Sequence, residues 1–133
     1  MPNPDRPTQI GRVGGSVYGP LNGDRSRTLD PTVGSEIKKT RPAIIVNDNS
    51  LGRLPLRIIV PVTDWKDRYK IAPWMIKIEP NFENGLTKES SADCFQVRSV
   101  SKDRFVKRLG ELSDSIMDEI RIGLSKVLSI DTK

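Results

Sequence analysis

The chain has 133 residues, enough for one domain with one hydrophobic core, and this length leaves little room for a separate catalytic module. It has no histidine and a single cysteine, Cys94, which excludes histidine-based acid–base catalysis, Ser-His and Cys-His nucleophile pairs, an internal disulfide and a multi-cysteine zinc site. The net charge of +5 favours an anionic partner such as a nucleic acid, although a merely soluble basic protein explains the charge equally well. We expect Cys94 to be a small buried apolar residue.

The start of the chain differs in composition from the rest. Residues 11–23 hold five of the ten glycines, residues 1–31 hold five of the ten prolines, and residues 11–28 contain only four apolar side chains. This composition predicts a loop or a flexible segment that lies outside the core. We therefore expect an atypical, flexible segment over residues 1–28 and one folded domain over residues 29–133.

Two short runs rich in β-branched residues follow, at residues 42–46 and 56–62, and both have the length of buried strands. The turn-rich segment 47–52 connects them. Pro61 cannot donate a ladder hydrogen bond, so it marks a sheet edge or a distortion just before Thr63.

Further strands are predicted at residues 74–79, 92–100 and 105–109. Trp74, Ile76 and Ile78 alternate with polar residues in the first of these and should share a buried face, with Trp74 in the core. Asn84-Gly85 indicates a turn, and Gly110 is expected to end the last strand.

Ser113 is predicted to cap a C-terminal helix. Apolar residues follow it at helical spacing and form one stripe, namely Ile116, Met117, Ile120, Leu124, Val127 and Leu128. About five short strands and one covering helix predict a mainly β fold, a small twisted barrel or half-barrel. No run approaches the roughly 20 apolar residues of a membrane span, and the N-terminus has no secretory signal pattern. We therefore expect a cytoplasmic protein.

The segment from Leu29 to Val46, LDPTVGSEIKKTRPAIIV, resembles the signature of MazF/PemK toxins, in which a DP-x-x-G-S-E loop leads to an Arg-Pro pair and an apolar strand. Other pieces follow in the order typical of that family: Pro61 to Thr63, Asn84 to Leu86, Gln96 to Arg98, Arg108 to Leu112 and the final helix. The resemblance covers residues 29 to about 130, which is most of the chain.

The resemblance implies an SH3-like barrel of the MazF/PemK/CcdB type and a homodimer. It implies a sequence-specific, metal-independent endoribonuclease toxin of a type II toxin-antitoxin system, which cleaves single-stranded mRNA without a cofactor. A cognate antitoxin is the implied protein partner, and the toxin–antitoxin complex is expected to bind DNA.

The catalytic arginine of the family falls on Arg41, its catalytic threonine on Thr63 and its loop glutamate on Glu36. Some PemK-type members instead carry an aspartate before the glutamine of the later strand, where this chain has Phe95. A guanidinium suits the charge on an RNA phosphate, and the Thr63 hydroxyl can orient the phosphate or the 2′-OH. Without the resemblance, a surface cation is the preferred interpretation of Arg41. Thr63 is then an alternative candidate for an ordinary strand-end residue, and Glu36 for a solvated charge or a partner of Arg41.

RNA contacts are predicted for Lys38, Lys39, Trp65, Gln96 and Arg98. The two lysines are suited to the RNA backbone, or they form a solvated loop pair. Trp65 lies among charged residues and can stack on a base or pack at a dimer interface. Gln96 and Arg98 are expected on one side of a single strand, where they suit base edges or cross-strand hydrogen bonds.

Two other functions compete with RNA cleavage. One is a protein-binding poison on a related barrel, like the CcdB toxins that trap gyrase, and the Arg41 and Thr63 pattern argues against it. The other is an inactive relative that still dimerises and binds antitoxin. Family members enter the DP-x-x-G-S-E loop from a first strand, but residues 20–28 here contain one apolar residue in nine, and the glycines in residues 9–18 weaken a substitute strand there. On this basis we expect low stability and weak or absent toxicity.

Overall fold

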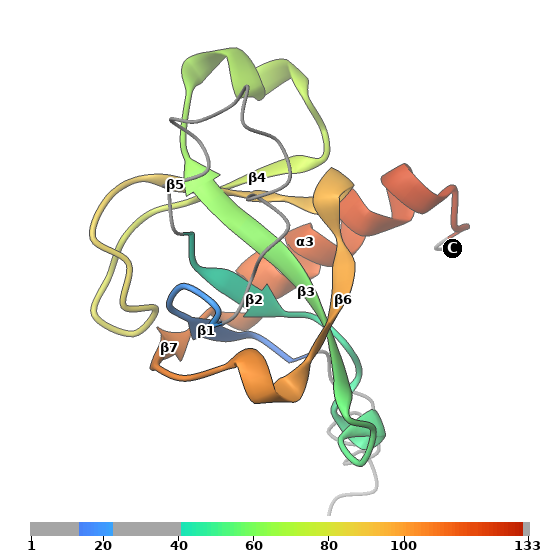
Figure 1. The fold of residues 1–133 in the computed structure, drawn as a ribbon. Coiled ribbons are helices and arrows are strands. Elements are labelled where there is room, and N and C mark those ends of the chain that lie inside the picture. The colour runs from blue at the N-terminus through green and yellow to red at the C-terminus, as the bar shows by residue number, and fades with distance from the viewer. Residues whose placement is uncertain (1–13, 23–40, 132–133) are drawn as a thin grey trace, which may run out of the picture.

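The structure is a computed structural model that describes residues 14–22 and 41–131. An antiparallel sheet forms the body of the protein, and the C-terminal helix packs across one of its faces (Figure 1). Its elements are β1 (Ser16–Tyr18), β2 (Ala43–Ile45), η3 (Asn49–Leu51), β3 (Leu56–Asp64), η4 (Asp67–Ile71), β4 (Met75–Ile78), β5 (Ser90–Asp93), η5 (Cys94–Gln96), β6 (Arg98–Ser101), η6 (Lys102–Arg104), β7 (Arg108–Glu111) and α3 (Asp114–Leu128), where η marks a 3-10 helix.

The strands lie in the order β4-β5-β3-β2-β1-β7, and β6 also pairs with β3. The predicted strands at residues 42–46, 56–62 and 74–79 are confirmed as β2, β3 and β4. The described residues form seven strands where about five were predicted. Two causes account for the difference: β1 was not predicted, and the single strand expected at residues 92–100 is divided by η5 into β5 and β6.

The long strand β3 organises the sheet because it has three partners. It pairs with β2 along one edge, and along the other edge it pairs first with β6, up to Ile59, and then with β5, from Val62 onward. The Val62 amide donates to the Pro42 carbonyl on the β2 side at 2.9 Å, so alternation directs the nitrogen of Pro61 to the other edge. Pro61 therefore stands where the ladder changes from β6 to β5, which is the distortion that its missing N–H predicted.

Successive residues of β2 and β3 point to the two faces of the sheet. Ile44, Val60 and Val62 lie on what we call the helix face, in the main core cluster that includes Met117 and Ile120 of α3. The other face, which we call the opposite face, carries Ala43 and Ile59 from the β2–β3 ladder and Thr63 from the β3–β5 ladder. A smaller apolar cluster on the opposite face consists of Ala43, Ile59 and Val100 with Leu21, Ile45 and Phe105 packed against it.

The C-terminal helix forms as predicted. The Ser113 hydroxyl caps α3 by accepting from the Ile116 amide at 3.3 Å. The stripe faces the core along most of the helix, but Leu128 at its end is 54% exposed. Cys94 is fully buried as predicted, and its thiol donates to the Ile120 carbonyl at 3.7 Å. No helix in the described part of the chain is long and apolar enough to cross a membrane.

The expectation that the residues before Thr28 lie outside the core is wrong for residues 16–18. These residues form β1, which pairs with β2 and β7, and Val17 is completely buried. The neighbouring glycines permit this strand instead of weakening it: a Cβ on Gly14 would lie 2.7 Å from the Ile45 carbonyl oxygen, and Gly15 has a φ of +120°. The sheet thus has a strand between β2 and β7, which removes the basis for expecting low stability and weak toxicity. The division of the chain at residue 29 stays a prediction, because residues 1–13 and 23–40 lie outside the described residues.

The last strand lies three residues later than predicted. Residues 102–104 form η6, and Phe105 ends that turn with its ring 4.9 Å from the ring of Tyr18, so the chain joins the sheet only at residue 108. Gly110 lies inside β7 instead of ending it. A Cβ there would lie 2.1 Å from the Glu83 carbonyl oxygen, so the close approach of that backbone requires the glycine. The predicted Asn84-Gly85 turn is confirmed, with φ of +72° at Gly85.

Candidate functional site

Arg41 and Thr63 lie where the chain enters β2 and where β3 ends. Arg41 lies two residues before β2, with Pro42 between them, and Thr63 lies near the end of β3. The β2–β3 ladder puts Val62 opposite Pro42, where the Val62 amide donates to the Pro42 carbonyl at 2.9 Å. One further residue in the same register puts Arg41 opposite Thr63, and side chains in such positions have Cβ atoms about 4.5–5.5 Å apart. Both residues are half-buried.

The same transverse row continues over two more strands. Thr63 pairs with Ser91 of β5, and Ser91 pairs with Lys77 of β4. Directly opposed residues of antiparallel strands share a face, so Arg41, Thr63, Ser91 and Lys77 all lie on the opposite face of the sheet. The sheet therefore sets two cations and two hydroxyls side by side.

Trp65 follows β3 and extends this arrangement by one row. Its amide donates to the Glu89 carbonyl at 3.2 Å, so the β3–β5 pairing reaches this residue. The half-buried indole donates from Nε1 to a carboxylate oxygen of Asp67 at 3.2 Å, and its ring meets the edge of Tyr69 with centroids 5.8 Å apart. The Lys77 ammonium lies 5.3 Å from the Trp65 ring centroid. The ring is thus held in place among charged side chains.

Lys77 is the cation at the far end of the row. Its ammonium forms ion pairs with Glu79 at 3.5 Å and with Glu89 at 3.6 Å. Desolvation lowers the pKa of Lys77, but the charges and hydrogen bonds of Glu89 and Glu79 outweigh it and raise the pKa above its ordinary value. Lys77 therefore stays protonated through the physiological range.

The prediction that Gln96 and Arg98 lie on one side of a single strand is wrong. Gln96 lies in η5, where its amide donates to the Asp93 carboxylate at 2.8 Å. Arg98 begins β6 and pairs with Ile59, so it lies on the opposite face with Thr63. Four residues along β3 separate Ile59 from Thr63, which is a distance of roughly 13 Å. Only Arg98 of this pair shares a face with the candidate catalytic residues.

The remaining predicted residues, Glu36, Lys38 and Lys39, lie outside the described residues. Sequence patterns did not single out Ser91, Lys77 or Glu89. The alternation in residues 74–79 had placed Lys77 away from the buried face, but its neighbours follow only from the strand register.

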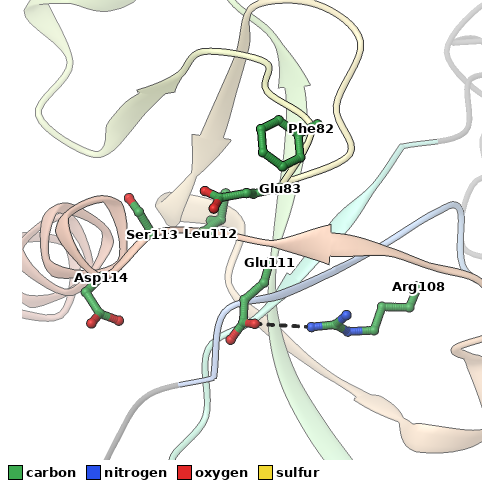
Figure 2. A pocket seen from close by; sticks show the side chains of 7 residues that line it. All are labelled: Phe82, Glu83, Arg108, Glu111, Leu112, Ser113 and Asp114. Carbon is green, nitrogen blue, oxygen red and sulfur yellow. Dashed lines mark hydrogen bonds and ion pairs between the residues drawn. The ribbon is translucent and has the colours of Figure 1, made fainter.

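An open depression of about 460 Å³ lies elsewhere, between the β4–β5 loop, β7 and the start of α3 (Figure 2). Phe82 and Glu83 from the loop line it together with Arg108, Glu111, Leu112, Ser113 and Asp114. Arg108 forms an ion pair at 3.4 Å with Glu111 of the same strand. Three carboxylates against one guanidinium make this depression a poor place for an RNA phosphate, and it shares no residue with the row around Thr63.

Comparison with known proteins connects these features to one family. A family model described as the PemK-like, MazF-like toxin of type II toxin-antitoxin systems matches residues 27–128. The chain is 32% identical to the endoribonuclease PemK of Escherichia coli over 104 residues, which cover 77% of this chain and 76% of that protein. It is 33% identical to the endoribonuclease MazF of Staphylococcus epidermidis over 104 residues, which cover 77% and 85% of the two chains.

The fold is similar to that of solved structures. The chain superposes with a TM-score of 0.65 and 20% identity on a mycobacterial endoribonuclease solved in complex with its cognate antitoxin, covering 91% of this chain and 98% of that one. Such a likeness bears on the fold, and it confirms the predicted mainly β half-barrel with one C-terminal helix.

Proposed function

Because the chain belongs to the PemK-like, MazF-like family of type II toxins, we propose that it is a toxin that cleaves single-stranded RNA at specific sequences without a metal ion. The observation that carries this proposal is the position of Arg41 opposite Thr63 in the β2–β3 register. The segment that enters β2 and the end of β3 then hold a phosphate-binding guanidinium and a hydroxyl at neighbouring positions. Rigid strands suit such a site because they fix the side chains before the substrate binds.

RNA supplies its own nucleophile for this reaction. The 2′-oxygen attacks the adjacent phosphorus, the bond from phosphorus to the 5′-oxygen breaks, and the proton lost from the 2′-OH is balanced by one gained at the 5′-oxygen. The products are a 2′,3′-cyclic phosphate and a 5′-OH end. Arg41 stabilises the charge that develops on the phosphate oxygens, since a guanidinium offers them a planar fork of N–H donors. Thr63 orients the phosphate or the 2′-OH, and Glu36 remains a candidate proton acceptor.

The partners follow from the same family membership. We propose a homodimer that acts in the cytoplasm on mRNA and is neutralised by a cognate antitoxin; the mycobacterial endoribonuclease with the same fold was solved in complex with one. Lys38, Lys39, Trp65 and Arg98 are the proposed RNA contacts. The position of Arg98 on the same face as Thr63 supports its inclusion.

Primer extension on a long RNA treated with the purified protein tests this function, because it reports both activity and cleavage motif. We expect cuts at one short motif, ends with 5′-OH and 2′,3′-cyclic phosphate, and unchanged activity in EDTA. The Arg41→Ala protein is the control for contaminating nucleases and should give no such cuts. Cleavage that EDTA abolishes and magnesium restores would contradict the proposed chemistry.

A further inference from the structure

The hydroxyl of Ser91 has no hydrogen-bond partner. Ser91 is fully buried. In the described part of the chain, its Oγ is the only buried side-chain nitrogen or oxygen atom without a hydrogen-bond partner. Its chain neighbour Ser90 points to the helix face, where its hydroxyl donates to the Lys88 carbonyl at 2.9 Å. A buried hydroxyl without a partner costs folding free energy, so its presence beside Thr63 calls for a reason.

Side chains from the neighbouring strands cover Ser91 on the opposite face of the sheet. β5 lies between β3 and β4 in the sheet, so the contact of Lys77 on β4 with Trp65 after β3 must cross over β5. It crosses at Ser91, which pairs with Lys77, and at Glu89, which holds the Lys77 ammonium at 3.6 Å. An aromatic face, a carboxylate and an unpartnered hydroxyl are thus gathered next to Thr63.

We propose that Trp65, Glu89 and Ser91 form a base-binding subsite next to Thr63, which takes a base with an exocyclic amino group in preference to uracil. The inference rests on the proposed RNA substrate. The base stacks on Trp65 in the place that the Lys77 ammonium occupies in the free protein, while Lys77 keeps its ion pair with Glu79. Ser91 then gains the hydrogen-bond partner that it lacks.

The local charge favours a base over a phosphate. One ammonium faces two carboxylates, Glu79 and Glu89, so the subsite carries a net negative charge that repels a phosphate and leaves it to Arg41. An ionised carboxylate only accepts hydrogen bonds. It therefore suits the amino group of adenine, cytosine or guanine, whereas uracil presents a carbonyl oxygen at the corresponding ring position.

Binding of short homopolymeric RNAs to the full chain tests the subsite without relying on cleavage. Oligoadenylate and oligocytidylate should bind more tightly than oligouridylate. Ser91→Ala should weaken binding of the first two by about three- to tenfold, the scale of one hydrogen bond. It should also leave the protein as stable as before or more stable, because an unpartnered buried hydroxyl is removed.

Ser90→Ala is the matched control, from the adjacent residue on the other face. It should lower the melting temperature, since a satisfied hydrogen bond is lost, and leave RNA binding unchanged. Glu89→Gln, an exposed substitution that does not endanger folding, should bring oligouridylate binding closer to that of the other two, because an amide also donates.

Three results would overturn the subsite: equal binding of all three homopolymers by the unmodified protein, no binding of any of them, or wild-type binding by both Ser91→Ala and Glu89→Gln. Cleavage of long RNA, measured on the same preparations, separates this from failure of the proposed function. If RNA is cut at a specific motif while the variants bind normally, the subsite is wrong and the proposed function stands. If RNA is bound as expected but never cut, the proposed cleavage is wrong and the subsite stands.

Discussion

The two faces of β3 differ in the character of the side chains around them. On the helix face, Val60 and Val62 lie in a dry cluster closed by α3. On the opposite face, Ile59 sits in a small apolar cluster, while Thr63 stands in a row of polar and charged side chains. Side chains only one residue apart along one strand therefore belong to surroundings of opposite character.

This difference teaches that stability and chemistry can be changed separately in one strand. A side chain on the helix face contributes chiefly by excluding water from the core. The side chains in the row around Thr63 are polar or charged and belong to neither apolar cluster, so we expect their removal to cost little folding free energy but to change what the surface can bind. Substitutions on the two faces should therefore have opposite profiles.

The largest effect is expected from Ile44→Ala on the helix face. Ile44 is fully buried, so its truncation should lower the free energy of unfolding by about 2–5 kcal/mol, through lost apolar burial and the cavity left behind. Chemical denaturation measures this loss. Ile71→Ala is the matched control, because Ile71 is 89% exposed and its truncation should change stability by less than about 0.5 kcal/mol. Equal losses in the two variants would show that the helix face is not the main core.

Arg41→Ala and Thr63→Ala should show the reverse profile. Each should lower RNA cleavage by at least about a hundredfold, the scale of one lost transition-state contact, and leave folding and dimerisation intact. Arg53→Ala and Thr87→Ala remove the same groups from exposed positions outside the strands and should cleave at wild-type rates. Wild-type cleavage by Arg41→Ala would remove the mechanism proposed above.

Gly15→Ala tests the strand that the sequence concealed. Gly15 has a φ of +120°, where a side chain is strained, so the substitution should cost roughly 1–3 kcal/mol of stability. Gly19 lies at the other end of β1, and a Cβ there meets its nearest atoms at 3.8 and 3.9 Å, so Gly19→Ala should be tolerated. If thermal unfolding finds the two variants equally stable, β1 is not fixed as described.

The last effect, which is absent at neutral pH, concerns Cys94 at the junction of the sheet and α3. Burial, with a contribution from the charge of Asp93, raises the pKa of the thiol to about 12 from a usual value of 9.0. The unfolded chain then loses this proton at lower pH than the folded one, so stability is intact below about pH 9 and falls between about pH 9 and 12. The free energy of unfolding should therefore fall more steeply over this range in the wild type than in Cys94→Ala. Identical slopes would mean that the thiol is not buried as described.

The fold could be predicted from the sequence wherever local pattern and tertiary pairing agree. The β-branched runs of β2 and β3 and the apolar stripe of α3 can be recognised from the sequence, because the residues that favour each element locally are also the ones that pack in the core. β1 has no such local pattern, since it is three residues long and is held by pairing on both edges. Gly14 is required by its close approach to the Ile45 backbone and Gly15 by its φ of +120°, whereas composition alone indicates only flexibility at these positions.

The candidate site divides in the same way. Arg41 and Thr63 were named from the family resemblance, but their opposed positions follow from the β2–β3 register. The sequence predicts Gln96 and Arg98 on one strand because no local sequence pattern indicates the turn η5. Ser91 has no sequence signal at all, because a buried hydroxyl without a partner is visible only once the strands around it are paired.

The turn η5 also restricts how the chain length can vary. The register of β6 on β3 differs from that of β5 by three residues, an odd number, so alternation reverses across the turn. Even-numbered Ala92 points to the helix face, whereas even-numbered Arg98 and Val100 point to the opposite one. An insertion or deletion of a single residue here would turn every side chain of β6 over, burying charge and exposing Val100. Homologous chains that keep this sheet are therefore expected to gain or lose residues at η5 only in pairs.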